Sequence, residues 1–243
     1  MEVKGFEVEG VIKVDNVRIY GIEESIIASG YPMQTETFNM NEINLKDKDL
    51  KRAMHLGNAV AGSGHDCFTK GITVQFDLQV SEYIWRQLDR YHFIDYVSSQ
   101  SKMHRILKID LDKACNKYVS RDAIYKLNDL INIYNTFDDF KIYVSGLEDS
   151  RKEAEYHRFR MKDRRMYFKE DIKKDEADEL TKENLFNMII ANTPSGIMLT
   201  ARMTTNYLQL KSIVNQRSNH KMQEWRLLCD YFKTLPIFDM VCK

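Results

Sequence analysis

The clearest pattern of hydrophobic and polar positions lies in residues 72–80, ITVQFDLQV. Because successive side chains of a strand point to opposite faces, its strict alternation predicts a strand with one buried and one polar face. The apolar face comprises Ile72, Val74, Phe76, Leu78 and Val80, and the polar face Thr73, Gln75, Asp77 and Gln79.

A helix is predicted to follow this strand directly. Ser81 has the residue type of a helix N-cap, and Glu82 suits the first turn. We therefore expect residues 82–91, EYIWRQLDRY, to be helical. Its apolar face would hold Ile84, Leu88 and Tyr91, and another face Arg86, Gln87 and Arg90.

The remaining segments give weaker patterns. Residues 1–30 are predicted to be strand-rich, with VIKVDNVRIYGI alternating imperfectly and SIIASG forming a short apolar run closed by Gly30. Residues 44–61 predict a helix that breaks into the loop GSGHD. Residues 109–143 combine the helical AIYKLNDLINIYNTF with the strand-like FKIYVSGL. The last third, from LFNMIIAN onward, is predicted to be long helices broken near Pro194-Ser195-Gly196.

Charge dominates residues 151–183, where both signs are interleaved and no proline intervenes. This composition predicts a solvated helical insert. Because the chain shows no internal repeat and no low-complexity linker, we expect a single domain over residues 1–243 that carries the insert.

Composition and charge narrow the classes of protein. A chain of 243 residues with 43% hydrophobic content buries a substantial core. Lys+Arg and Asp+Glu both number 36, so net charge gives no case for nucleic acid or a membrane as partner. The N-terminus has no apolar segment after a basic start, and no window reaches the roughly 18–20 apolar residues of a membrane span. These features predict a cytoplasmic protein.

The cysteines and histidines are scattered. Cys67, Cys115, Cys229 and Cys242 form no CxxC pair and are predicted to be free thiols. The one tight mixture of ligand types is His65-Asp66-Cys67. Adjacent side chains on an extended segment point to opposite faces, so we predict no metal there.

Several catalytic motifs are absent from the sequence: GxGxxG after a strand, GxxxxGK[ST], HExxH and GxSxG. What remains is two groups of arginines among amide and imidazole side chains. Guanidinium groups suit phosphate and amides read base edges, so the combination favours a nucleotide. Taken singly, such an arginine is more often a surface residue, and an asparagine in TTNY is a helix cap. The groups are Arg86, Gln87, Arg90 and His92, and then Asn206, Arg217 and Gln223.

These residues resemble the flavin-dependent thymidylate synthase family. GHDC stands where the family has a Gly-His-acid-Thr/Ser turn, and RQLDRYH where it has Arg-Gln-x-x-Arg-His-Arg followed by a serine, here Ser101. Asn206, Arg217 and Gln223 fall at the family's spacing near the C-terminus. The resemblance implies an α+β fold with an antiparallel or mixed sheet flanked by long helices.

The resemblance also implies roles for individual residues. The FAD cofactor would be held by Ser29, His65, Cys67, Arg90, Tyr91, His92 and Asn206. Deoxyuridylate (dUMP) or a related pyrimidine nucleotide would be held by Arg86, Gln87, Ser101 and Arg217. No side-chain nucleophile is implied. The family uses reduced flavin and NADPH to transfer a methylene from methylenetetrahydrofolate to C5 of dUMP, in a homotetramer whose sites are shared between subunits.

This chain departs from the family's pattern at several arginines. Arg-His-Arg becomes Arg90-Tyr91-His92, in which Tyr91 is either a substitution for the histidine or an insertion that places Phe93 at the second arginine. Other family arginines are replaced by Met103, Ile189 or Ile190, and Leu208; Lys102, Arg105 and Arg202 are the candidate replacements.

Three functional hypotheses follow from these residues. The chain is a divergent flavin-dependent enzyme, or it has kept the fold as an inactive or flavin-free nucleotide-binding or regulatory protein. In the third, the basic run Arg158–Arg165 contacts nucleic acid or an acidic partner, with a solvated helix as the alternative.

Overall fold

A computed structural model describes residues 1–35, 44–60, 63–136 and 181–242 of the chain. It divides into two compact units, which are described separately. Unit 1 comprises Met1–Gln100 with Met198–Lys243, and unit 2 comprises Ser101–Ile197.

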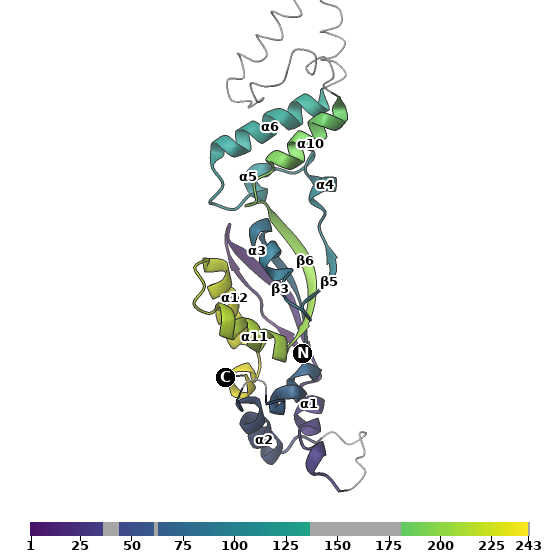
Figure 1. Ribbon diagram of the computed structural model, residues 1–243, viewed down its shortest axis with the longest axis vertical. Helices are drawn as coiled ribbons and strands as arrows, with labels where there is room; N and C mark the ends of the chain where they lie inside the picture. Colours follow the sequence, from purple (N-terminus) through teal and green to yellow (C-terminus); the bar gives the residue numbers. More distant parts are fainter. Residues whose placement is uncertain (36–43, 61–62, 137–180, 243) are drawn as a thin grey trace, which may run out of the picture. The chain divides into compact units, whose positions relative to one another are not determined.

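Unit 1 is built on an antiparallel sheet (Figure 1). Its strand order is β1-β3-β4-β6-β5, with β2 also paired to β3. The predicted strand at residues 72–80 is confirmed as β4, which pairs with β3 on one side and with β6 on the other. The strands are β1 (Glu2–Val3), β2 (Phe6–Val8), β3 (Ile12–Tyr20), β4 (Thr73–Ser81), β5 (Asp95–Ser99) and β6 (Met198–Asn206).

One face of this sheet holds the core of unit 1. Val74, Phe76 and Leu78 on β4 are fully buried, as the alternation predicts. The rings of Phe76 and Phe232 pack edge to face, with their centroids 5.9 Å apart. The intervening polar residues of β4 are half-buried on the other face. A salt bridge of 3.2 Å between Asp77 and Arg202 joins β4 to β6 on that polar face.

Helices cover the apolar face, and α11 and α12 run beside the sheet (Figure 1). Trp225 of α12 is completely buried in the same core. The helix predicted at residues 44–61 is confirmed as α2. The helices of unit 1 are α1 (Ile22–Ala28), η1 (Tyr31–Met33), α2 (Asp47–Gly57), η2 (His65–Gly71), α3 (Glu82–Leu88), α11 (Tyr207–Arg217), α12 (Gln223–Lys233) and α13 (Phe238–Val241).

Unit 2 has a hydrophobic core of its own. Leu127 on α6 and Ile189 on α10 belong to it, and α6 confirms the helix predicted from AIYKLNDLINIYNTF. The sequence signals of its helix starts are plain, because the side chains of Ser120 and Thr181 accept backbone N–H bonds as N-caps. The helices are α4 (Lys102–Arg105), α5 (Leu111–Ala114), α6 (Arg121–Asn135) and α10 (Lys182–Asn192).

Two predictions of secondary structure were wrong. Residues 198–206, expected to be helical, form the strand β6 between β4 and β5, since pairing on both edges outweighs the helical propensity of Met, Leu, Ala and Arg. The run SIIASG, expected within strand-rich sequence, lies largely in helix α1, whose Ile26 and Ile27 are buried.

The strand-like FKIYVSGL and almost all of the predicted insert at 151–183 lie outside the described residues; of the insert, Thr181 caps α10 and Lys182 and Glu183 begin it. Every helix in the described ranges is too short or too polar to span a bilayer.

Candidate functional site

Gln87 projects from α3 towards the C-terminal helices. Ser81 occupies the N-cap position of α3 as predicted, although its buried hydroxyl has no hydrogen-bond partner among the described residues. The Oε1 atom of Gln87 accepts a 2.9 Å hydrogen bond from Trp225 Nε1. Its Nε2 atom lies 3.1 Å from the sulfur of Met222. The helix that follows β4 is therefore linked to α12 through one amide.

Arg217, at the end of α11, meets the same indole. Its Cζ atom lies 4.8 Å from the Trp225 ring centroid and 5.5 Å from that of Tyr91. Arg217 Nε also donates a 2.7 Å hydrogen bond to the Tyr91 hydroxyl. We refer to Gln87, Tyr91, Arg217 and Trp225 as the Trp225 cluster. It brings together two residues predicted to bind the nucleotide, 130 positions apart in sequence.

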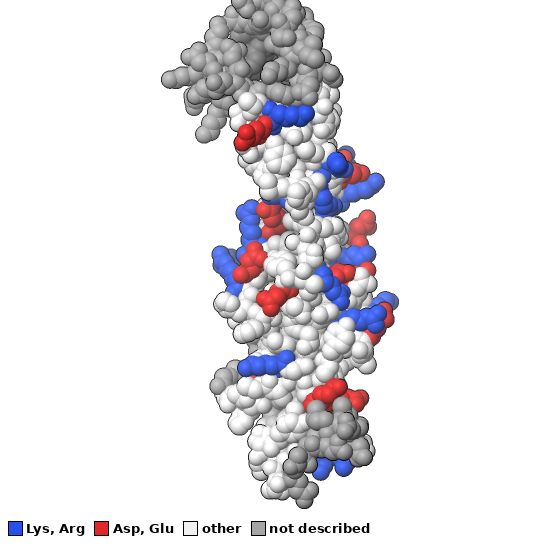
Figure 2. Space-filling view, turned by 90° about the vertical axis from the view of Figure 1, so that its right-hand side faces the viewer, with Lys and Arg blue, Asp and Glu red and all other residues white. Residues whose placement is uncertain are grey.

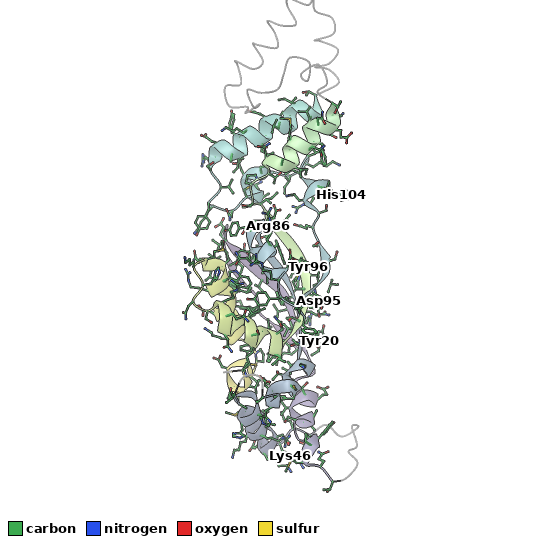
Figure 3. The ribbon with its side chains drawn as sticks, viewed as in Figure 1. Tyr20, Lys46, Arg86, Asp95, Tyr96 and His104 are labelled. Carbon is green, nitrogen blue, oxygen red and sulfur yellow. The ribbon has the colours of Figure 1, made fainter. Side chains whose placement is uncertain are left out.

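The helix α3 is shorter than predicted, and this changes the placement of Arg90. It ends at Leu88, and a turn closed by Tyr91 N–H bonding to Leu88 O follows. Arg90 therefore does not share a helix face with Arg86 and Gln87, and its side chain is exposed. Arg86, on the surface of α3 (Figure 3), pairs with Glu82 at 3.1 Å.

Two residues predicted to hold the flavin have structural roles in unit 1. The Ser29 hydroxyl donates to Ile26 O and accepts from Arg52 Nε at 3.0 Å, so both of its functions are used. Asn206 caps α11 by accepting the Gln209 N–H at 3.0 Å. This is the helix-cap role that the sequence offered as the alternative to flavin binding. The Nδ2 group of Asn206 has no partner in the described part of the chain.

His65 and Cys67 lie on η2, and their side chains are exposed. The side chain of His92, which follows α3, is exposed as well. Between the first two, Asp66 turns inward and forms a buried salt bridge of 3.0 Å with Lys211 of α11. Lys211 also donates to Gly57 O at 2.6 Å. This buried pair fixes η2 to α11 and α2. No group of three metal-ligating side chains occurs in the described residues.

Ser101 belongs to unit 2, where its hydroxyl accepts the His104 N–H at 3.4 Å as the N-cap of α4. Two of the residues that stand where the family has arginines differ in burial. Ile189 is fully buried in the core of unit 2, whereas Met103 is exposed. Arg202, a candidate replacement, is engaged by Asp77 and by Asn16 O at 2.7 Å on the polar sheet face.

His220 lies close enough to Arg217 for its titration to respond to the Arg217 charge. Burial, followed by the charges of Arg217 and Arg226, lowers the pKa of His220. The His220 ring lies 6.2 Å from the Trp225 ring, and its Nδ1 accepts the Met222 N–H. Sequence reasoning missed Trp225, His220 and Lys211. An available signal was the single tryptophan in the C-terminal third, two residues after Gln223 and three residues after Met222.

A shallow hollow of about 340 Å³ lies along the C-terminal helices of unit 1. Its lining comes from α11, α12 and the C-terminal segment, and it contains none of the predicted site residues. The lining residues are Val214, Asn215, Ser218, Lys233, Asp239 and Cys242.

Comparison with known proteins gives a structural match and no sequence match. The chain matches no protein-family model and no curated protein. A flavin-dependent thymidylate synthase ThyX from Helicobacter pylori, solved in complex with FAD and dUMP, is similar with a TM-score of 0.57. The alignment covers 94% of this chain and 98% of that chain at 12% identity.

The chain therefore has the flavin-dependent thymidylate synthase fold. A second ThyX structure from Helicobacter pylori, also with FAD and dUMP, gives a TM-score of 0.52 at 12% identity and covers 94% of this chain and 95% of that one. The predicted α+β class with this fold is confirmed. At 12% identity the likeness carries the fold alone, so the activity of this ThyX-like chain must be argued from its own residues.

Proposed function

We propose that this chain is a divergent flavin-dependent thymidylate synthase-like enzyme. In this proposal it binds dUMP or a related pyrimidine nucleotide and transfers a one-carbon unit to C5, with NADPH and methylenetetrahydrofolate as co-substrates. The observation that carries the proposal is the Trp225 cluster, in which Gln87 and Arg217, from distant segments of the sequence, contact the same indole. Trp225 itself is buried, but the half-buried amide and guanidinium that it holds suit a planar base that carries a phosphate.

Arg217 is the proposed phosphate ligand, because a guanidinium stays charged and presents a fork that matches phosphate oxygens. Gln87 is the proposed reader of the pyrimidine edge, because its Nε2 has one N–H directed at sulfur, a weak acceptor, and a second N–H available. Arg86, on the same helix as Gln87, belongs to the proposed nucleotide set, and the nucleotide-binding role of Ser101 stays a prediction from the family resemblance.

The donor chemistry for FAD is present on the chain. The side chains of His65, Cys67, Arg90 and His92 are exposed, and Asn206 keeps its Nδ2 donors. When bound, reduced flavin would supply the reducing chemistry of the transfer. The protein's residues would orient the two rings and neutralise charge on the nucleotide. A homotetramer with shared sites is part of this proposal.

A second candidate is a nucleotide-binding protein of the same fold that lacks flavin. It is favoured by Ser29 and Tyr91, whose hydroxyls each donate their one O–H within unit 1 and so have no donor left for a flavin. The loss of the family arginines at Met103, Ile190 and Leu208 favours it as well.

The two candidates separate in one experiment. The purified protein is scanned for flavin absorbance before and after incubation with FAD and gel filtration, and dUMP-dependent NADPH oxidation is then measured. Retained flavin with dUMP-dependent oxidation supports the enzyme. Binding of dUMP without flavin absorbance supports the second candidate, and failure to bind dUMP at millimolar concentration refutes both.

An Arg217→Met variant tests the site itself. Loss of one charge-assisted hydrogen-bonding group should weaken dUMP binding by about 10- to 150-fold. Arg18→Met is the matched control, because Arg18 lies on β3 of the same unit and pairs only with exposed Glu2 at 3.0 Å. Equal dUMP affinities of the two variants would exclude Arg217 from the site.

A further inference from the structure

Tyr91 is held against Arg217 rather than directed towards the other predicted flavin residues. Its hydroxyl accepts the Arg217 Nε–H at 2.7 Å and donates to Gln216 Oε1 at 3.0 Å. Its ring packs on Trp225, with centroids 5.9 Å apart. Both hydrogen-bonding functions of this hydroxyl are therefore spent on α11, and the residue is fixed at both ends of its side chain.

The same contacts restrain the guanidinium of Arg217. The indole of Trp225 covers it at 4.8 Å, the Tyr91 ring lies at 5.5 Å, and the bond to Nε fixes its rotation in the guanidinium plane. An arginine side chain normally loses conformational entropy when it is immobilised. Here that cost is met by contacts within the fold, before any ligand arrives.

The terminal nitrogens of Arg217 remain unused. Among the described residues, its four Nη N–H groups have no hydrogen-bond partner; the one hydrogen bond of its side chain uses Nε. Glu224 on α12 is buried and accepts a hydrogen bond from the Tyr83 hydroxyl. An oriented guanidinium fork whose Nη groups have no hydrogen-bond partner among the described residues is suited to a dianionic phosphate.

We infer that Tyr91 is a positioning residue for an anion site, in which it holds Arg217 over Trp225 so that the Nη fork receives the phosphate of a nucleotide. This rests on the proposed function for the identity of the nucleotide, and it moves Tyr91 from the flavin set to the nucleotide set. In this proposal the Tyr91 hydroxyl acts on the nucleotide through Arg217.

The test compares Tyr91→Phe with Tyr96→Phe in the full chain. Tyr96 is the matched control, because it lies on β5 (Figure 3) and its hydroxyl donates to exposed Asp89 at 2.6 Å. The probes are dUMP and inorganic phosphate, titrated by calorimetry and by Trp fluorescence. Tyr91→Phe should weaken both by about 3- to 10-fold, the effect of losing one hydrogen bond, and Tyr96→Phe should weaken neither.

A direct readout of Arg217 separates positioning from a general effect on folding. In ¹⁵N-edited NMR spectra, assigned with an Arg217→Lys variant, the Arg217 Nε–H proton should exchange slowly with solvent in the wild type and in Tyr96→Phe. It should exchange fast in Tyr91→Phe, with the thermal midpoint unchanged within a few degrees.

Three outcomes overturn one or both proposals. If Tyr91→Phe binds both probes like the wild type, the positioning role is refuted. If the wild type binds phosphate in a Tyr91-dependent way but does not bind dUMP, the role stands and the proposed function fails. If the wild type binds neither probe, both fail.

Discussion

Removal of the Lys211 ammonium should strongly destabilise unit 1. The side chains of Lys211 and Asp66 are only 5% and 11% exposed, and their salt bridge of 3.0 Å joins α11 to η2. Lys211→Met leaves the Asp66 carboxylate buried without its counter-charge, which costs about 3–5 kcal/mol. It also removes the donor to Gly57 O. With a urea m-value of about 2–3 kcal/mol/M, the unfolding midpoint should fall by roughly 1–2 M.

The assay is urea unfolding followed by tryptophan fluorescence, because Trp85 and Trp225 both lie in unit 1 and report on it alone. The control is Lys233→Met, which removes a more exposed salt bridge of similar length, 3.1 Å, to Asp230. This change should lower the free energy of unfolding by less than about 1 kcal/mol.

The double variant Asp66→Leu with Lys211→Met removes both charges and should recover much of the loss. A Lys211→Met midpoint close to that of the Lys233→Met control would refute the reasoning, since the pair would then be solvated in solution. A double variant as unstable as the sum of both single variants would show that no coupling exists between the charges.

Three further predictions concern local chemistry. At pH 8, Ellman's reagent should modify only exposed Cys67 in the native chain, because burial raises the pKa of the other thiols and excludes the reagent; fast modification of more than one thiol would contradict this. Those pKa values rise to about 11 for Cys115 and Cys229 and to about 12 for Cys242. Phe93 has a φ of 62° and is 70% exposed, so Phe93→Gly should raise the free energy of unfolding by about 1 kcal/mol, whereas Phe93→Ala, which keeps the strain, should not. NMR titration should place the pKa of His220 below 6.5, and Arg226→Gln should raise it. A lowered pKa means that the folded state favours the neutral imidazole. The contribution of His220 to stability is therefore present above pH 6.5 and is lost as the pH falls through the pKa of the folded state. If Arg226→Gln leaves the pKa of His220 unchanged, the Arg226 charge is excluded as a cause of the shift.

The surface charges of the described residues agree with the neutral composition. On the face seen in Figure 2, Lys and Arg are interspersed with Asp and Glu. Exposed ion pairs also form, such as Lys13 with Glu7 at 3.3 Å. With a formal net charge of zero, attraction of the proposed nucleotide would depend on local groups such as Arg217.

Part of the candidate site was predictable and part was not. The family resemblance grouped Gln87 and Arg217 as nucleotide ligands, and both lie in the Trp225 cluster. It placed Tyr91 with the flavin, whereas the chain directs this side chain to Arg217. The residue type at a matched position shows which hydrogen bonds and charges a side chain can offer. Which partner that side chain contacts depends on the path of the backbone, here the turn after α3.

Local sequence determined the features whose cause is local. The alternation in residues 72–80 determined β4 and its buried face, and the periodicity before residue 136 determined α6, since each pattern reports which side chains must leave water. Only the tertiary structure decided that residues 198–206 form a strand, because their hydrogen bonds go to β4 and β5, more than 100 positions away in sequence. It also decided the contact of Tyr91 with Arg217, for which no periodicity within either segment carries information.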